Sequence, residues 1–321
     1  MLHIRSGDDI LGILKAAGLP GKFIKWCDAF CQGPTPSGLS YDAWRAVRTN
    51  FISDYFDLPF SEVLGDYTKM DQELERFREH EAVLLWFEHD LFCQIILIYL
   101  LDWFSKRKLE GTKLYLLCTG EYLGRMSAER LAGLFGTEHE VTAEETALAK
   151  KAWRAFCASD PSALEALIAE ETSSLPFLRK ALLRHLQQFP SAENGLSRTE
   201  QVALEVIGSG KNRLEEIFRE FQNRDPDAGW GDAMFWGDLK GLTRGKTPLL
   251  AMGGSGSWPS RDHPSSELTL HLTPKGEEIL KGADDWITMN GIDRWLGGVH
   301  LSGGKALWRW EGRGHRLVRE K

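Results

Sequence analysis

The stretch AVLLWFEHDLFCQIILIYLL, residues 82–101, decides the fold that we predict for this chain. Its first six residues are an apolar run of strand length, and the triplet Glu88-His89-Asp90 separates them from a longer apolar run that reads as a helix. A buried strand that leads directly into a helix is typical of an open α/β sheet, in which ligands bind beyond the carboxyl ends of the strands. The triplet is therefore a candidate site.

The residue types of the triplet indicate its chemistry. A Glu-His pair at a strand-to-helix junction suits general acid/base catalysis, and His89 would exchange the proton because the imidazole pKa lies nearest neutrality. Glu88 and His89 are thus the predicted catalytic residues, although a surface turn without function is an open alternative. Asp90 is also a favoured helix N-cap residue. Gln94 is a further candidate, because its helical spacing from Asp90 directs it back towards the strand end.

Strand-like and helix-like segments alternate over the first third of the chain. Each strand-like segment precedes a helical pattern or a turn, and these segments are residues 2–4, 22–26, 82–87 and 113–118. This order predicts an α/β domain over residues 1–125, with a mostly parallel sheet and flanking helices. The carboxyl ends of parallel strands meet at one edge, where acidic side chains would gather.

Gathered carboxylates repel one another unless they are protonated or bind a cation. We therefore predict that Asp28, Glu88 and Asp90 hold a divalent cation or orient water, with Asp8 and Asp9 as further candidates. Capping of the first helix explains one of the latter two. A zinc site, for which Cys27, Cys31, Cys93 and His89 are candidates, is favoured less, because the chain has no second closely spaced cysteine pair.

The rest of the chain divides into two regions. Residues 126–190 show helical patterning and are predicted to form a helical connector, and residues 190–194 to form an exposed linker. Residues 195–321 show three short helices followed by a hairpin, which is the order of a winged-helix domain. They hold 18 Lys and Arg residues against 18 Asp and Glu residues, and this neutral balance favours packing or protein interaction over DNA binding.

Composition limits the class of protein. The chain has 321 residues, 42% of them hydrophobic, and its net charge of −7 falls entirely within residues 1–194. The longest apolar run, residues 95–101, is too short to span a membrane, and the N-terminal residues lack a secretory pattern. Five cysteines are too sparse for a disulfide framework. We therefore expect a cytoplasmic protein with no membrane partner.

Five segments together resemble a bacterial family known as domain of unknown function eighteen thirty-five, and the likeness covers nearly the whole chain. The segments are Leu2 to Asp8, Trp26 to Pro34, Trp86 to Leu91, Asn194 to Glu200 and Asn290 to Gly298. The resemblance implies no reaction, since none is established for the family. The family pattern usually has His and Glu at the positions of Cys31 and Gln32, and an acid at Cys93. These departures lie beside the predicted site.

The last of these segments combines paired glycines, a tryptophan and the pair Asp293-Arg294. Asp293 and Arg294 are candidates for residues that close over the first domain. A structural role, with both charges paired to neighbours, is the alternative.

The leading hypothesis is a cation-assisted hydrolase or transferase that acts on a small polar or phosphorylated substrate. The alternative is a regulatory protein that senses a small-molecule ligand in the acidic pocket and binds DNA or a protein partner through the winged-helix-like region.

Overall fold

The computed structural model describes residues 1–7, 10–261, 263, 266–304 and 308–320, so the predicted candidates Asp8 and Asp9 lie outside the described residues. The strands are β1 (Leu2–Arg5), β2 (Lys22–Lys25), β3 (Gly33–Pro34), β4 (Ala82–Glu88), β5 (Lys113–Thr119), β6 (His139–Glu140), β7 (Leu250–Gly253), β8 (Thr269–Leu272), β9 (Ile292–Gly297), β10 (Val299–Gly303), β11 (Trp308–Glu311) and β12 (Arg316–Arg319).

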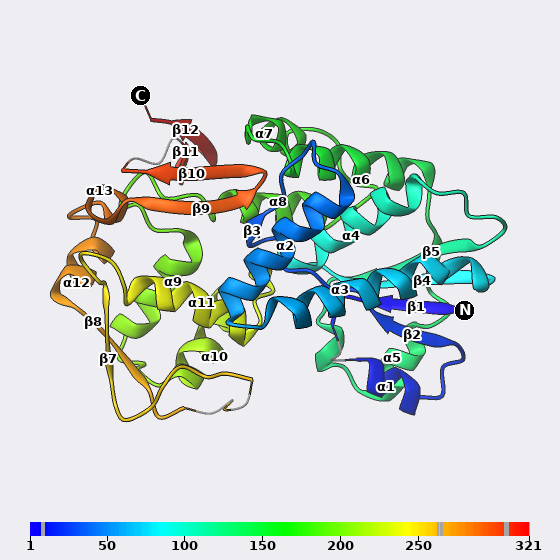
Figure 1. The fold of residues 1–321 in the computed structure, drawn as a ribbon, viewed down its shortest axis with the longest axis horizontal. Helices are drawn as coiled ribbons and strands as arrows, with labels where there is room; N and C mark the ends of the chain where they lie inside the picture. Colours follow the sequence, from blue (N-terminus) through cyan, green and yellow to red (C-terminus); the bar gives the residue numbers. More distant parts are fainter. Residues whose placement is uncertain (8–9, 262, 264–265, 305–307, 321) are drawn as a thin grey trace.

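The α-helices are α1 (Leu11–Ala16), α2 (Tyr41–Phe56), α3 (Phe60–Glu75), α4 (Leu91–Ser105), α5 (Ala128–Leu134), α6 (Ala143–Phe156), α7 (Ser162–Ile168), α8 (Leu178–Leu186), α9 (Arg198–Gly208), α10 (Leu214–Arg224), α11 (Asp232–Leu242), α12 (Pro274–Leu280) and α13 (Trp286–Asn290). Short 3₁₀ turns are η1 (Arg76–Glu79), η2 (Leu123–Arg125) and η3 (Pro226–Ala228). Figure 1 shows their arrangement.

A five-stranded mixed sheet with the order β2-β1-β4-β5-β6 organises the first part of the chain. Its first four strands are parallel and β6 is antiparallel. The four strands predicted from the sequence are confirmed, and so is the mixed α/β character. The side chains from Val83 to Glu88 are all buried, because helices cover both faces of the sheet.

The two faces of this sheet are covered by different helices. Helix α4 packs against α6 and α8 on one face, whereas α1 and α5 enclose a separate apolar cluster around Trp86 on the other (Figure 1). Residues 126–190, predicted to be a connector, therefore supply α5, α6, α8 and β6 to the α/β layers themselves.

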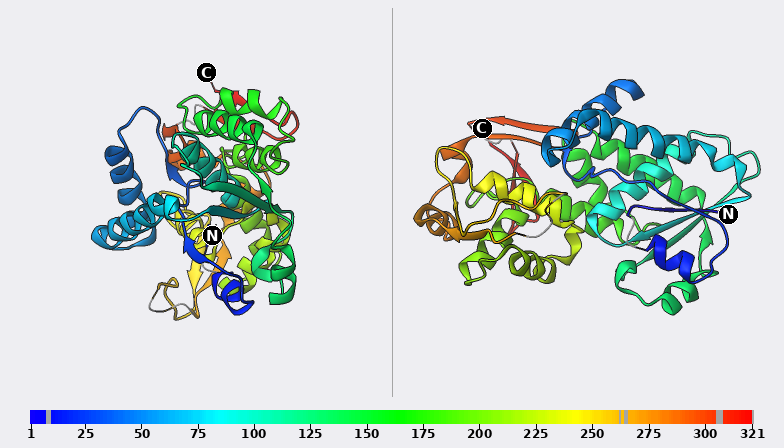
Figure 2. Two further views of the ribbon diagram at one scale, coloured as in Figure 1. Left: turned by 90° about the vertical axis from the view of Figure 1, so that its right-hand side faces the viewer. Right: turned by 60° about the horizontal axis from the view of Figure 1, so that its bottom comes forward.

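The C-terminal elements lie at one end of the long axis and the five-stranded sheet at the other (Figure 2). Helices α9, α10 and α11 precede the β7–β8 hairpin, and β9 pairs with both β10 and β3. The prediction of an exposed linker at residues 190–194 is wrong in part. Pro190 and Asn194 are buried and Ser191 bridges to Trp310, because β11 runs beside this segment.

Within the described ranges, no helix combines the length and the apolar character that crossing a membrane would need.

Candidate active site

The candidate site lies where the strand order of the sheet reverses. Strand β1 has β2 on one side and β4 on the other, and the chain runs from β1 to β2 but from β4 to β5. The two connections leave in opposite directions, and such a switch point opens a crevice at the carboxyl ends of the two strands. Ser6 and Gly7, which follow β1, and Asp90, which follows β4, line a cavity of about 500 Å³ there.

Glu88, the last residue of β4, is held in a buried ion pair. Its Oε1 atom lies 2.9 Å from a guanidinium nitrogen of Arg5 and accepts the Leu123 backbone N–H at 2.5 Å. Both charged side chains are only 4% exposed. The charge of Glu88 is thus balanced within the protein. Sequence reasoning missed Arg5, although its place at the end of the strand beside β4 was a signal for this pairing.

Asp90 has both of the roles that the sequence suggested. Its Oδ1 atom accepts the Cys93 backbone N–H at 2.9 Å and caps α4, while the same side chain lines the cavity. Burial, together with the negative charge of Glu88, raises the pKa of Asp90 to about 7. A carboxyl group with this pKa exchanges protons readily near neutral pH.

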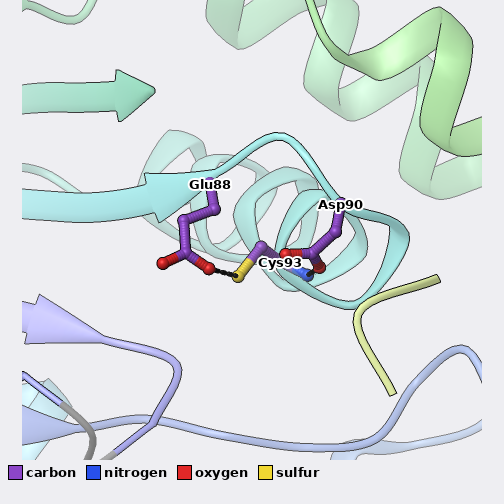
Figure 3. A group of neighbouring side chains, drawn as sticks. All are labelled: Glu88, Asp90 and Cys93. Atoms are coloured by element: carbon purple, nitrogen blue, oxygen red, sulfur yellow. Dashed lines mark hydrogen bonds between the residues drawn. The ribbon is translucent and has the colours of Figure 1, made fainter. Parts of the chain in front are cut away.

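Cys93 completes a compact group with Glu88 and Asp90, whose potential ligand atoms all lie within 4.8 Å of one another (Figure 3). The Cys93 thiol donates to Glu88 at 3.7 Å and lies 3.4 Å from the Ser6 hydroxyl. Burial raises the pKa of this thiol well above its ordinary value, so it stays protonated.

The same group meets the guanidinium of Arg5, which donates to Cys93 Sγ at 3.4 Å. A divalent cation placed among these side chains would face the buried positive charge of Arg5. The geometry therefore suits proton transfer and hydrogen bonding better than cation binding.

Asp28, predicted as a cation ligand, lies in a different cluster. It is buried in an ion pair with Arg48, whose Nη2 atom is 2.5 Å from Asp28 Oδ1, and Arg45 lies 3.6 Å away. Two arginines of α2 thus interact with the Asp28 carboxylate. Among the described residues, the compact group at the strand end consists of Glu88, Asp90 and Cys93, with Cys93 in the place that we predicted for Asp28.

His89 and Gln94 flank the site without lining its cavity. Successive residues of an extended segment point in opposite directions, so His89 faces away from Glu88 and Asp90. Its ring contacts those of Tyr122 and Phe177, and burial lowers its pKa. Gln94 reaches back as its spacing predicts, and donates to the Glu88 carbonyl oxygen at 2.6 Å. It holds the strand end in place.

Asp293 and Arg294 lie around another cavity, of about 660 Å³, together with Cys31 and Gln32. Arg294 pairs with Glu200 at 2.5 Å, and Asp293 pairs with His300 at 2.7 Å. The prediction that these two residues meet the first part of the chain is consistent with the pairing of β9 with β3, but they do not cover Asp90.

The cover over Asp90 comes from the turn between α10 and α11. Gly229 in this turn has a left-handed φ of 71°, and a Cβ atom there would overlap the Asp90 carboxylate. Two ion pairs fasten the turn to α8, Arg184–Asp225 at 2.7 Å and Lys180–Asp227 at 2.8 Å. Trp230 and Met234 extend the lining of the cavity. Sequence patterns carry no signal for this contact, because the two segments are far apart in the chain.

No family model matches this chain. A search of curated proteins also finds no relative. The chemistry of the site itself is therefore the basis for a function.

Among the described residues, the cavity offers the Asp90 carboxyl group, which titrates near neutrality, the buried Arg5–Glu88 ion pair and the neutral thiol of Cys93. Asp90 can donate or accept a proton, while the charges of Arg5 and Glu88 neutralise each other beside it. The turn at Gly229 limits the access of water to the carboxyl group.

Proposed function

We propose that this protein is an enzyme, a hydrolase or transferase that acts on the polar group of a small substrate, with Asp90 as the proton-transferring residue. The observation that carries the proposal is the position of Asp90: a buried carboxyl group in a cavity at the switch point of a parallel sheet. Its pKa near neutrality supports the assignment.

The other side chains of the cavity have supporting roles in this proposal. Arg5 neutralises the charge of Glu88, and this ion pair influences the pKa of Asp90. Ser6 lies within reach of the same cavity and supplies a hydroxyl group for hydrogen bonds to a substrate. The sequence-based form of the hypothesis has a divalent cation bound by Asp28, Glu88 and Asp90. In the structure Cys93 takes the place of Asp28 beside the other two, and Arg5 already contacts both Glu88 and Cys93.

The regulatory alternative is supported less well. We propose that α9, α10, α11 and the β7–β8 hairpin form a winged-helix-like unit, in which α11 would be the DNA-reading helix. The Tyr55 hydroxyl of α2, however, donates to Asp238 of α11 at 2.9 Å, and a Cβ atom at Gly237 would overlap Tyr55. The helix that would enter a DNA groove is covered by the first part of the chain.

We also propose that the protein works in the cytoplasm, because none of its five cysteines forms a disulfide within the described residues. Membership of the family of unknown function that the five sequence segments resemble is likewise our proposal.

The test compares Asp90→Asn with His89→Gln. Asparagine keeps the helix cap but cannot exchange the proton, so turnover of a panel of p-nitrophenyl esters and p-nitrophenyl phosphate should fall by about a hundredfold or more. His89→Gln should retain turnover, because His89 lies outside the cavity lining. The pH profile of kcat/KM in the wild type should report a group that titrates near pH 7.

The opposite pattern would contradict the proposal. Loss of turnover in His89→Gln, with turnover retained in Asp90→Asn, would assign the proton transfer to the histidine. Salt-dependent binding of the full chain to duplex DNA, without turnover of any ester, would support the regulatory alternative.

A further inference from the structure

A second cavity adjoins the polar one. It has a volume of about 670 Å³ and lies between β2 and the helices α2 and α3. Four residues line both cavities: Lys25, Cys27, Phe92 and Met234. The two cavities thus share part of their lining and lie next to each other.

The second cavity, which we call the β2 groove, has an apolar wall and a charged mouth. Its half-buried apolar side chains come from β2, α2, α3 and the turn between the two helices, and they include Phe23, Ile52, Phe56, Leu58 and Met70. Lys22, Asp66 and Lys69 are exposed at its rim. Concave apolar surfaces with a few polar groups are typical of small-molecule sites, and the volume lies within the usual range.

We propose that the β2 groove holds the apolar chain of the substrate whose polar group reacts at Asp90. The substrate class is then a single-chain amphiphile, with a small polar head in the cavity beside Ser6 and Asp90. This inference rests on the proposed function, since it takes the polar cavity as the reacting site. The apolar wall supplies binding energy away from the reacting group, which is how enzymes position small heads for proton transfer.

An extended peptide is the competing occupant, because β2 is an edge strand with a neighbour on one side only. Two contacts argue against it. Lys22 forms an ion pair with Glu73 of α3, and the Trp26 indole N–H donates to Asp71 of the same helix at 3.3 Å. These contacts hold the two ends of β2 against α3, and a strand added along this edge would have to fit between them.

The experiment measures binding of simple amphiphiles to the full chain by isothermal titration calorimetry. The probes are butyrate and octanoate, and butylamine and octylamine as a second head-group series. Each buried methylene should tighten binding about fourfold, so the eight-carbon compound of the preferred series should bind roughly 250-fold more tightly than its four-carbon partner. Comparing the carboxylate series with the amine series shows whether the polar cavity binds a negatively or a positively charged head group.

Two variants test where the chain lies. Ile52→Trp fills the groove, and Met70→Glu places a charge in it; both positions are half-buried, and each variant should reduce the affinity for the eight-carbon compound to that of the four-carbon one. Leu64→Trp is the matched control, since Leu64 is 38% exposed on α3 and lines a different cavity. The control should bind both compounds as the wild type does. Melting curves that match the control would show that the groove variants fold.

Three results would overturn the inference. If the four- and eight-carbon compounds bound equally well, and Asp90→Asn weakened binding of the four-carbon compound, the apolar chain of the ligand would not lie in the β2 groove. The proposed function would still hold. If Asp90→Asn left the affinity for the eight-carbon compound unchanged, the β2 groove and the reacting site would not bind the same molecule. Binding of an uncharged hexapeptide of alternating valine and threonine, with no binding of any amphiphile, would assign the groove to strand addition.

Discussion

Replacing Asp90 with asparagine should remove a pH dependence of stability that the wild type shows. The ordinary pKa of an aspartate is 3.8, and burial in the fold raises that of Asp90 to about 7. The fold therefore favours the protonated form. The stabilisation that protonated Asp90 provides is complete below about pH 4 and is lost as the pH rises through 7.

The size of the effect follows from the two pKa values. A difference of about 3 pKa units corresponds to about 4 kcal/mol over the whole range, and about 3 kcal/mol of that is lost between pH 5 and pH 8. Asparagine keeps the acceptor for the Cys93 N–H, so the cap of α4 remains and the charge alone changes. The variant should lose about 3 kcal/mol less stability than the wild type over the same interval.

The assay is urea unfolding of both proteins at pH 5 and pH 8, because comparing the two cancels the titration of all other groups. Asp90→Ala is the control for the cap, and it should be about 1 kcal/mol less stable than Asp90→Asn at both pH values. Equal pH dependence in the wild type and Asp90→Asn would refute the reasoning, since it would mean that Asp90 titrates at its ordinary pKa.

Three other predictions concern the surroundings of this carboxyl group. Glu88→Gln should destabilise the protein by about 3 kcal/mol because it removes the charge that pairs with the buried guanidinium of Arg5. Arg5→Met combined with Glu88→Gln should recover most of that loss in a double-mutant cycle, whereas additive losses would mean that the ion pair contributes nothing. Gly229→Ala should lower the melting temperature and shift the pH profile of the site, because the added Cβ atom displaces Asp90. Gly231→Ala is the control and should do neither, because the space around its Cβ atom is open. Equal effects at both glycines would contradict the close contact between Gly229 and Asp90. Millimolar Mg²⁺, Mn²⁺ or Zn²⁺ should leave the melting temperature unchanged, because the positively charged guanidinium of Arg5 already contacts Glu88 and Cys93. A clear rise with any of these ions would support the cation-assisted form of the hypothesis.

The sequence alone determined the local elements around the site. The apolar run at residues 82–87 and the helix after Asp90 both depend on patterns that repeat every two to four residues, and the structure contains both where the patterns predict them. The cap at Asp90 and the backward reach of Gln94 follow from the same short-range geometry. The orientation of His89 also follows from the sequence, because side chains alternate along an extended segment and His89 therefore points away from Glu88 and Asp90.

Only the tertiary structure decided which charges meet. Asp28 and Glu88 both lie at the carboxyl ends of predicted strands and looked equivalent in the sequence, yet Asp28 pairs with Arg48 from α2 and Glu88 with Arg5 from β1. The cover of Asp90 by Gly229 depends on how α10 and α11 dock, and no local pattern encodes that contact. The physical reason is one of range: backbone geometry and hydrophobic periodicity act between near neighbours in the chain, whereas the pKa of a buried carboxyl group depends on whichever side chains the packing of distant segments places around it.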